Sequence, residues 1–303
     1  MAPRVVLLTG ATTGIGLALA RKLVRSDFRV VLTARASSLP RFEEEGIAES
    51  ERVLIRPLDV VSDADRRAVV SEVERRWGGV DVLVNNAGVS YRSVVEHMTH
   101  ADEQEQMDIN FFGPMRLIRL VLPGMRARRR GHIINVSSVS GMMAMPTMGA
   151  YSASKWALEG ATEALWYEMR PWGVHVTLVQ PGFVKSSSFE RVRLTGGAEA
   201  SLKSEGDPYH AYYQNMTPFV ARMMRWAVST PEDVADVVLS TTSARWPRMR
   251  VAGTHDARLF YFLRRLLPRF VYHWVLYRGL PNIRAWGPGS LKEGGRRLVG
   301  EGE

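Results

Sequence analysis

A glycine-rich segment near the amino terminus limits the possible folds of this chain more than any other feature. The apolar residues 5–8 lead into Thr9-Gly10-Ala11-Thr12-Thr13-Gly14-Ile15-Gly16, and a helical pattern over residues 17–25 follows at once. Glycines at a strand-to-helix turn let the backbone approach a pyrophosphate, and the helix N-terminus attracts its charge. A plain tight turn is the alternative, but the strand before it and the helix after it favour a dinucleotide site.

The rest of the first 180 residues alternates between short β-branched runs and longer helical stretches. The runs cover residues 5–8, 29–33, 53–58, 80–84, 132–136 and 174–179, and helical stretches include 15–26, 64–77, 107–130 and 152–171. Continuous apolar strands separated by helices indicate a parallel sheet that is buried on both faces. We therefore predict an α/β fold with a doubly wound parallel sheet of about seven strands, which binds ligands beyond the carboxyl ends of the strands.

The pattern loosens after about residue 185. We predict one catalytic domain over residues 1–253, with a substrate lid at 185–227, and a basic amphipathic extension at 254–303. A helix is expected to begin at Thr230-Pro231-Glu232-Asp233, which combines a capping hydroxyl, a proline and acids in the first turn.

Composition excludes several kinds of site. The chain has no cysteine, which rules out disulfides, thiolate metal sites and a cysteine nucleophile. No cluster of His, Asp and Glu has metal-ligand spacing, so no metal is expected. The apolar run at residues 5–8 is too short for a signal peptide, and no run of about 18 uncharged apolar residues occurs. We therefore expect a cytoplasmic protein.

Further motifs follow the glycine turn in a fixed order. They are Asp59-Val60, Asn85-Asn86-Ala87-Gly88, Asn110 in N-x-x-G, Ser138, Tyr151-Ser152-Ala153-Ser154-Lys155 and Pro181-Gly182. Together with T-G-x-x-x-G-I-G they resemble the classical short-chain dehydrogenase/reductase (SDR) family over roughly residues 4–190, with weaker similarity through 252. The resemblance implies a Rossmann-type sheet, a nicotinamide cofactor and an oxidoreductase that interconverts a carbonyl and an alcohol.

The predicted catalytic residues are Asn110, Ser138, Tyr151 and Lys155. Tyr151 and Lys155 are four residues apart in a helical segment and thus share one face. Because a phenol with a pKa near 10 is a poor acid–base catalyst at neutral pH, we expect the ammonium and the oxidised nicotinamide to favour the phenolate. By the resemblance, Tyr151 is the acid in reduction, Ser138 polarises the carbonyl, Lys155 also binds the nicotinamide ribose, and Asn110 holds a water.

Most other matched positions are assigned to the cofactor. The predicted cofactor residues are Thr9, Gly10, Thr12, Thr13, Gly14, Ile15, Gly16, Arg35, Asp59, Val60, Asn86, Ala87, Gly88, Tyr151, Lys155, Pro181, Gly182, Val184 and Ser186. Ser186 stands where family members usually have threonine, and it keeps the hydroxyl. The second strand ends in Arg35 without an acid, and arginine there suits a 2′-phosphate. We therefore predict NADP(H) over NAD(H); a solvated surface arginine is the alternative.

The predicted substrate is bulky and lipophilic: steroid-, retinoid-, terpenoid- or acyl-like. Its predicted contacts are Met142, Met143, Met145, Met148 and Phe183. Methionine adapts to apolar ligands, although core packing or a dimer contact would explain the methionines as well. An aromatic, methionine-rich stretch at residues 209–226 adds a second apolar wall.

Two other functions remain as alternatives. A non-catalytic NADP(H)-sensing protein could use the same fold, but it need not keep the tyrosine–lysine pair. A nucleic-acid binder is suggested only by charge. Its sharpest cluster is Arg126, Arg128, Arg129 and Arg130, and these residues lie at a predicted helix C-terminus, where cations complement the dipole. We therefore expect no nucleic-acid partner.

The net charge of +9 is concentrated at the carboxyl end. Residues 244–303 hold 12 Lys+Arg and 4 Asp+Glu, while residues 1–243 hold 28 and 27. Arginines alternate with large apolar residues over 258–277, which suits one or two short helices on an anionic membrane surface or a partner. The alternative is that these helices close the substrate pocket and leave their arginines in solvent. We also expect a homodimer or homotetramer, because the family assembles through the helices predicted at 107–130 and 152–171.

Overall fold

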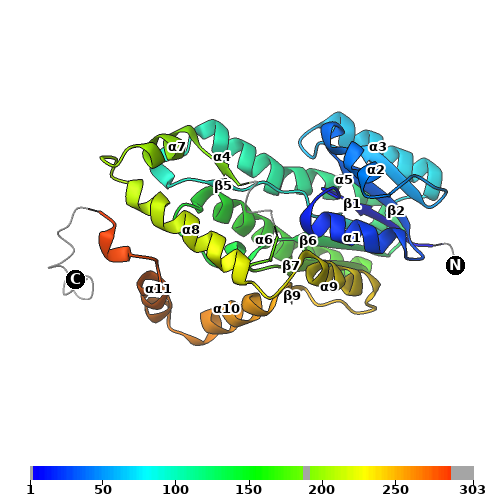
Figure 1. The fold of residues 1–303 in the computed structure, drawn as a ribbon. Coiled ribbons are helices and arrows are strands. Elements are labelled where there is room, and N and C mark those ends of the chain that lie inside the picture. Colours follow the sequence, from blue (N-terminus) through cyan, green and yellow to red (C-terminus); the bar gives the residue numbers. More distant parts are fainter. Residues whose placement is uncertain (1–2, 187–191, 288–303) are drawn as a thin grey trace.

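The structure is a computed structural model that describes residues 3–186 and 192–287 (Figure 1). Within this part of the chain, a seven-stranded parallel sheet forms the centre of the molecule. Its order is β3 (Val53–Pro57), β2 (Arg29–Ala34), β1 (Val5–Leu8), β4 (Val82–Asn85), β6 (Gly131–Val136), β7 (Val174–Gln180) and β9 (Arg250–Ala252). The predicted doubly wound sheet is confirmed, and its winding direction changes between β1 and β4.

Two layers of helices cover the sheet because successive strand residues point to opposite faces. Val6 and Leu8 face one hydrophobic core together with α1 (Gly14–Val24), α2 (Pro40–Glu44) and α9 (Pro231–Ser243). Val5 and Leu7 face the other core together with α3 (Asp63–Trp77), α5 (Gly113–Ala127) and α6 (Gly149–Met169). All four of these strand residues are at most 1% exposed, as a sheet buried on both sides requires.

The remaining elements lie beyond the carboxyl ends of the strands or follow β7. They are α4 (His100–Met107), a two-stranded sheet of β5 (Tyr91–Arg92) and β8 (Arg193–Leu194), α7 (Gly196–Lys203), α8 (His210–Trp226), α10 (His255–Leu266) and α11 (Arg269–Arg278). The predicted lid thus contains α7 and α8, while its residues 187–191 lie outside the described residues. Residues 288–303 of the predicted extension lie outside them too.

The arginine cluster at the carboxyl end of α5 makes contacts within the protein. Arg128 donates hydrogen bonds to the carbonyl oxygens of Gly78 and Val80, at 3.1 and 2.8 Å. Arg130 pairs with Asp81 at 3.5 Å, and Arg126 lies over the ring of Trp172. These contacts give the basic cluster a structural role. In the described part of the chain, no helix is long and apolar enough to span a bilayer.

Candidate active site

A cavity of about 990 Å³ opens at the carboxyl ends of β1, β2, β4, β6 and β7. Residues from the glycine turn and from the ends of these strands line it, which is where a doubly wound sheet binds ligands. The cavity reaches from Arg35 and Arg41 past Tyr151 to Val220 and Met224 on α8. One space therefore brings together most of the residues that the sequence assigned to cofactor, catalysis and substrate.

The glycine turn has the shape that a pyrophosphate needs. Gly10 and Gly14 have φ of +65° and +53°, in the left-handed region that favours glycine. A Cβ on Gly16 would lie 2.0 Å from the carbonyl oxygen of Gly10, whereas one on Gly14 would meet no atom within 4 Å. The turn is thus closed toward the protein at Gly16 and open at Gly14. The residues present fit a dinucleotide, with its phosphates at the N-terminus of α1.

Thr9 and Gly16 act behind the cavity wall. Neither residue is among those that line the cavity. The Thr9 hydroxyl oxygen accepts hydrogen bonds from the backbone N–H groups of Asn86 and Ala87, both at 3.0 Å. The Asn86 side chain donates in turn to the carbonyl oxygens of Thr9 and Gly10, at 3.1 and 3.0 Å. Thr9 therefore holds the glycine turn against the end of β4, and its predicted contact with the cofactor is replaced by this positioning role.

The other predicted cofactor residues line the cavity. From the glycine turn these are Gly10, Thr12, Thr13, Gly14 and Ile15, and from the later motifs they are Arg35, Asp59, Val60, Asn86, Ala87, Gly88, Tyr151, Lys155, Pro181, Gly182, Val184 and Ser186. Ser38 and Arg41 line it beside Arg35, although the sequence reasoning did not include them. Both residues follow Arg35 closely in the sequence. A short helical turn at Ala36–Ser38, followed by α2, brings them back toward the end of β2.

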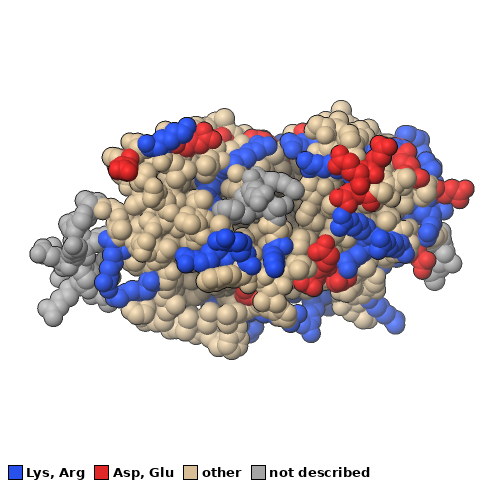
Figure 2. All heavy atoms as spheres, viewed as in Figure 1, with Lys and Arg blue, Asp and Glu red and all other residues tan. Residues whose placement is uncertain are grey.

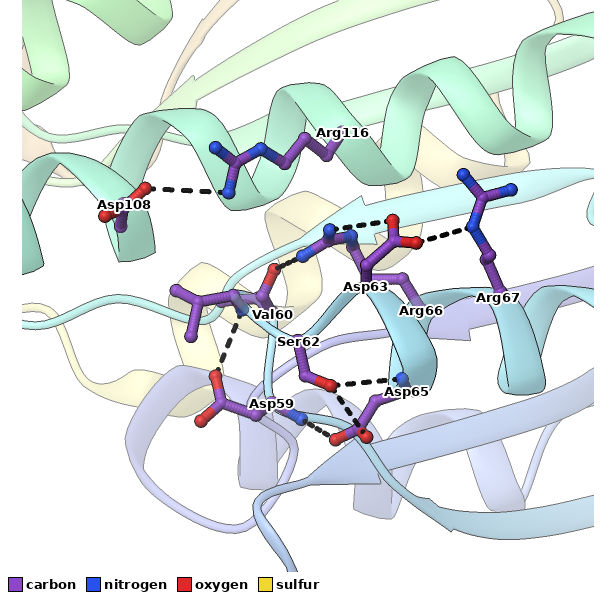
Figure 3. A network of polar contacts seen from close by, with 10 residues as sticks. Asp59, Val60, Ser62, Asp63, Asp65, Arg66, Arg67, Asp108 and Arg116 are labelled. Carbon is purple, nitrogen blue, oxygen red and sulfur yellow. Dashed lines mark hydrogen bonds and ion pairs between the residues drawn. The ribbon is translucent and has the colours of Figure 1, made fainter.

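The loop after β3 is tied to the start of α3 (Figure 3). The backbone N–H of Asp59 donates to Asp65 at 2.9 Å, and Arg66 donates to the carbonyl oxygen of Val60 at 2.5 Å. Asp63 pairs with both Arg66 and Arg67, which holds the buried guanidinium of Arg66 in place. This network fixes Asp59 and Val60 at the rim of the cavity on the side expected for adenine.

Tyr151, Lys155 and Ser138 meet at the centre of the cavity. Ser138 follows β6, and Tyr151 and Lys155 lie in the first turns of α6. The Lys155 ammonium donates to the carbonyl oxygen of Val136 at 3.0 Å and lies 5.9 Å from the centroid of the Tyr151 ring. Ser138 hydrogen-bonds to the Tyr151 phenol. The phenol and a hydroxyl are therefore placed together, as the reduction of a carbonyl requires.

Burial governs the protonation of this pair. Burial raises the pKa of Tyr151 above its ordinary value, and the hydrogen bond from Ser138 opposes that rise. Burial lowers the pKa of Lys155 to about 8, against the attraction of Glu159. The expected lowering of the Tyr151 pKa by Lys155 is not what the protein alone shows, because burial raises this pKa and the opposing contribution comes from Ser138. The phenol is protonated at neutral pH and can serve as an acid.

Asn110 lies on a π-helical turn, Asp108–Phe112, between α4 and α5. Its amide group exchanges two hydrogen bonds with the backbone of Val89, both at 2.9 Å, and donates to the Ser154 hydroxyl at 3.0 Å. A Cβ on Gly88 would lie 3.3 Å from the Asn110 side-chain oxygen and 3.8 Å from the Lys155 nitrogen. Asn110 thus lies next to Lys155 and holds the loop after β4. A water between the two stays a prediction.

The predicted substrate residues divide into two groups. Met145, Met148 and Phe183 line the cavity, together with Val220 and Met224 of α8. Met142 and Met143 do not line it. Both are less than 10% exposed and pack in a separate cluster with residues of α10 and α11. Their assignment to the substrate is therefore corrected: they join the extension to the body of the protein, which is the core-packing alternative.

Two cavity features were missed by the sequence reasoning. Arg92 on β5 is 2% exposed and lines the cavity, and burial lowers its pKa to about 10. Asp256 in the first turn of α10 accepts a hydrogen bond from the backbone N–H of Phe183, and Thr254 accepts one from Gly182, both at 2.8 Å. Nothing in the local sequence marks these long-range contacts. No cluster of three or more potential metal ligands occurs in residues 3–186 and 192–287.

Comparison with known proteins agrees with this geometry. The family model described as short chain dehydrogenase matches residues 4–195. Human retinol dehydrogenase 8 is 34% identical over 255 residues, which cover 82% of this chain and 81% of that protein. A short-chain dehydrogenase from Streptomyces avermitilis has a TM-score of 0.76 at 30% identity, covering 92% of this chain and 98% of the other.

Two similar structures contain nicotinamide cofactors. A short-chain dehydrogenase/reductase from Burkholderia phymatum, in complex with NAD, has a TM-score of 0.71 at 26% identity and covers 90% of this chain and 95% of its own. A metagenomic short-chain oxidoreductase, in complex with NADP, has a TM-score of 0.63 at 31% identity, with coverages of 82% and 96%. The chain belongs to the short-chain dehydrogenase/reductase family and is an oxidoreductase.

Proposed function

We propose that this protein is an NADP(H)-dependent oxidoreductase that interconverts a carbonyl and an alcohol on a lipophilic substrate. The observation that carries the proposal is the single cavity with three kinds of lining. It has Arg35 and Arg41 at one end, Ser138, Tyr151 and Lys155 between the ends, and three methionines with Phe183 and Val220 at the other end.

The two arginines support the choice of NADP(H). Arg35 and Arg41 line the cavity where β2 ends, and the sequence there, Ala34-Arg35-Ala36-Ser37-Ser38, has no acid to bind a ribose 2′-hydroxyl. A guanidinium offers charge-assisted hydrogen bonds to a 2′-phosphate, and the Ser38 hydroxyl can add another. Arg35, Ser38 and Arg41 would hold the adenosine end, and the open turn at Gly14 would hold the pyrophosphate.

The central residues supply proton transfer and orientation. When bound, the nicotinamide supplies the hydride acceptor or donor. In reduction, Ser138 donates a hydrogen bond to the substrate oxygen while Tyr151 transfers its phenolic proton to that oxygen, and in oxidation Tyr151 accepts the proton. Lys155 stabilises the phenolate that forms, because its ammonium is held nearby by the carbonyl oxygen of Val136. Positioning and electrostatics are thus the contribution of the protein.

The apolar end of the cavity supports a lipophilic substrate. Met145, Met148 and Phe183 come from the loops after β6 and β7, and Val220 and Met224 come from α8. Burial of apolar surface stabilises binding by about 25 cal/mol per Å², so a large apolar substrate gains most here. The name of one relative, retinol dehydrogenase 8, fits a retinoid-like substrate, and steroid-, terpenoid- and acyl-like substrates fit the same wall.

Steady-state turnover tests the proposal. The rate is measured for five carbonyl substrates, each with NADPH and with NADH as the cofactor. The substrates are retinal, a steroid ketone, a terpenoid ketone, a long-chain aliphatic ketone and glyceraldehyde. We expect kcat/KM to be higher with NADPH and with one of the lipophilic carbonyls. Arg35→Asp should remove the cofactor preference, while Arg75→Asp on the exposed face of α3 should keep it. Equal use of NADH or a preference for glyceraldehyde would contradict the proposal, and tight NADPH binding without any turnover would favour a sensing protein.

A further inference from the structure

The helices α10 and α11 expose large apolar side chains in regular stripes. On α10 these are Leu259, Phe262 and Leu266, with 55–61% of their surface exposed. On α11 they are Phe270, Trp274 and Tyr277, with 45–76% exposed. The spacings of three, four and seven residues place each trio on one side of its helix. Each helix therefore shows an apolar stripe to the outside of the protein.

One other side of each of these two helices is packed against the protein. Ala257 and Tyr272 are buried against Val139, Met142 and Met143, and Phe260 and Leu263 join the same cluster. Thr254 caps α10 by accepting a hydrogen bond from the backbone N–H of Ala257. Because the inner faces hold both helices on the body, the outer stripes are fixed surface features.

The same surface is strongly basic. Residues 254–287 contain six arginines and a single acid, Asp256, which already accepts a hydrogen bond from Phe183. All six arginines are exposed, and Arg278 lies 5.0 Å from the centroid of the Trp274 ring. In Figure 2, the lower left part, where Figure 1 places these two helices, is mostly tan with blue, whereas red gathers elsewhere on this face.

The exposed apolar stripes and the arginines beside them together favour one kind of partner. A second copy of the same face would bring arginine against arginine, which disfavours self-association. Aromatic and aliphatic side chains beside arginines fit the boundary between lipid headgroups and acyl chains, where the rings are buried and the guanidinium groups meet phosphates. We propose that α10 and α11 form a docking face for the surface of an anionic phospholipid membrane, with the helices lying in its plane.

The docking face adjoins the wall of the apolar cavity. Leu280, Ile283 and Trp286, which follow α11, pack against Met216 and Val220 of α8. Val220 also lines the cavity. A protein held on a membrane through α10 and α11 therefore places the lid helix next to the lipid phase, from which a lipophilic substrate would enter. The docking itself does not depend on the proposed reaction.

Co-sedimentation of the full-length protein with lipid vesicles tests this inference. Vesicles of phosphatidylcholine alone are compared with vesicles that contain 30% phosphatidylserine, at low and at high NaCl. We expect binding to the phosphatidylserine vesicles, which high NaCl reduces, and much weaker binding to phosphatidylcholine. Surface potential contributes about 1 kcal/mol per basic residue, so Arg269→Glu should weaken binding about fivefold or more.

Matched controls separate docking from general effects of charge and folding. Arg75→Glu makes the same charge change on α3 and should bind like the unaltered protein. Trp274→Ser should weaken binding, and Trp246→Ser, at a residue that is 78% exposed, should not. Thermal unfolding midpoints check that each variant is folded. The proposal is overturned if the unaltered protein does not bind vesicles, or if Arg269→Glu and Arg75→Glu lose binding equally. It is also overturned if the protein binds no vesicles but forms a dimer in gel filtration that Trp274→Ser dissociates.

Discussion

At the scale of single residues, the buried ammonium of Lys155 lowers the free energy of unfolding, while the same side chain is part of the candidate active site. It is 5% exposed, its pKa falls to about 8, and its one hydrogen bond from the ammonium goes to the carbonyl oxygen of Val136. Tyr151 and Lys155 were predictable because four residues of spacing place them on one helix face. Their depth was not predictable, because it depends on loops that the sequence does not join. Arg92 was missed for the same reason, whereas Ser38 and Arg41 were missed although they follow Arg35 closely in the sequence.

Replacing Lys155 by methionine should stabilise the protein and abolish its activity. Between pH 8 and 10.5 the unfolded chain binds more protons than the folded one, so the Lys155 contribution to the free energy of unfolding increases with pH across this window. At pH 7, we expect Lys155→Met to raise the free energy of unfolding by about 1–2 kcal/mol, because the burial cost exceeds the lost hydrogen bond.

Urea unfolding of both proteins, at pH 7 and at pH 10, measures this effect. The advantage of Lys155→Met should shrink at pH 10, where the buried lysine is neutral. Glu159 keeps a partner in the variant, because it pairs with Arg250 at 2.5 Å. A variant that is less stable than the parent protein at pH 7 would show that burial does not dominate at Lys155.

At the scale of elements, periodicity predicted six strands of the sheet nearly to their ends, and it missed local breaks. The expected helix over residues 107–130 divides into the π-helical turn Asp108–Phe112 and α5. Pro114 near the start of α5 lacks a backbone N–H, so the regular series of helical backbone hydrogen bonds is interrupted there. This break holds Asn110 at the site. The short β9 was not located, because three residues give no usable periodicity.

A buried histidine between β6 and β7 leads us to predict that the protein loses stability in acid. His132 on β6 is 1% exposed, hydrogen-bonds to Thr177 on β7 at 3.0 Å, and burial lowers its pKa to about 3. Its ordinary pKa is 6.5, so between pH 6.5 and 3 the unfolded chain binds the extra proton, and the free energy of unfolding decreases as the pH is lowered through this window. Because of His132, the free energy of unfolding should be about 2 kcal/mol lower at pH 5 than at pH 7.

Guanidinium unfolding at pH 7 and pH 5 checks this in the parent protein and in His132→Gln. The variant should lose about 2 kcal/mol less between the two pH values. His175, whose pKa is lowered mainly by burial, is present in both proteins. The same loss with and without His132 would mean that this histidine is not the acid-sensitive group of the two strands.

At the scale of the whole molecule, charge and function are separated along the chain. The excess of basic residues lies after residue 243, while the residues that line the cavity lie before it, in the nearly neutral body. None of the residues of α10 and α11 lines the cavity. The sequence predicted that separation. It did not show that the extension also holds the loop after β7 through Asp256 and Thr254. Assembly into a homodimer or homotetramer stays a prediction.

Transfer of a labelled hydride tests the central claim most directly, namely that Tyr151 and Lys155 serve carbonyl reduction. The protein is given NADPH that carries deuterium at both C4 positions of the nicotinamide, together with the best lipophilic carbonyl of the panel. Mass spectrometry should find deuterium on the carbinol carbon of the product. Tyr151→Phe should still bind NADPH and form the labelled product about 10²–10⁴-fold more slowly. Product without deuterium, or an unchanged rate in Tyr151→Phe, would contradict the account.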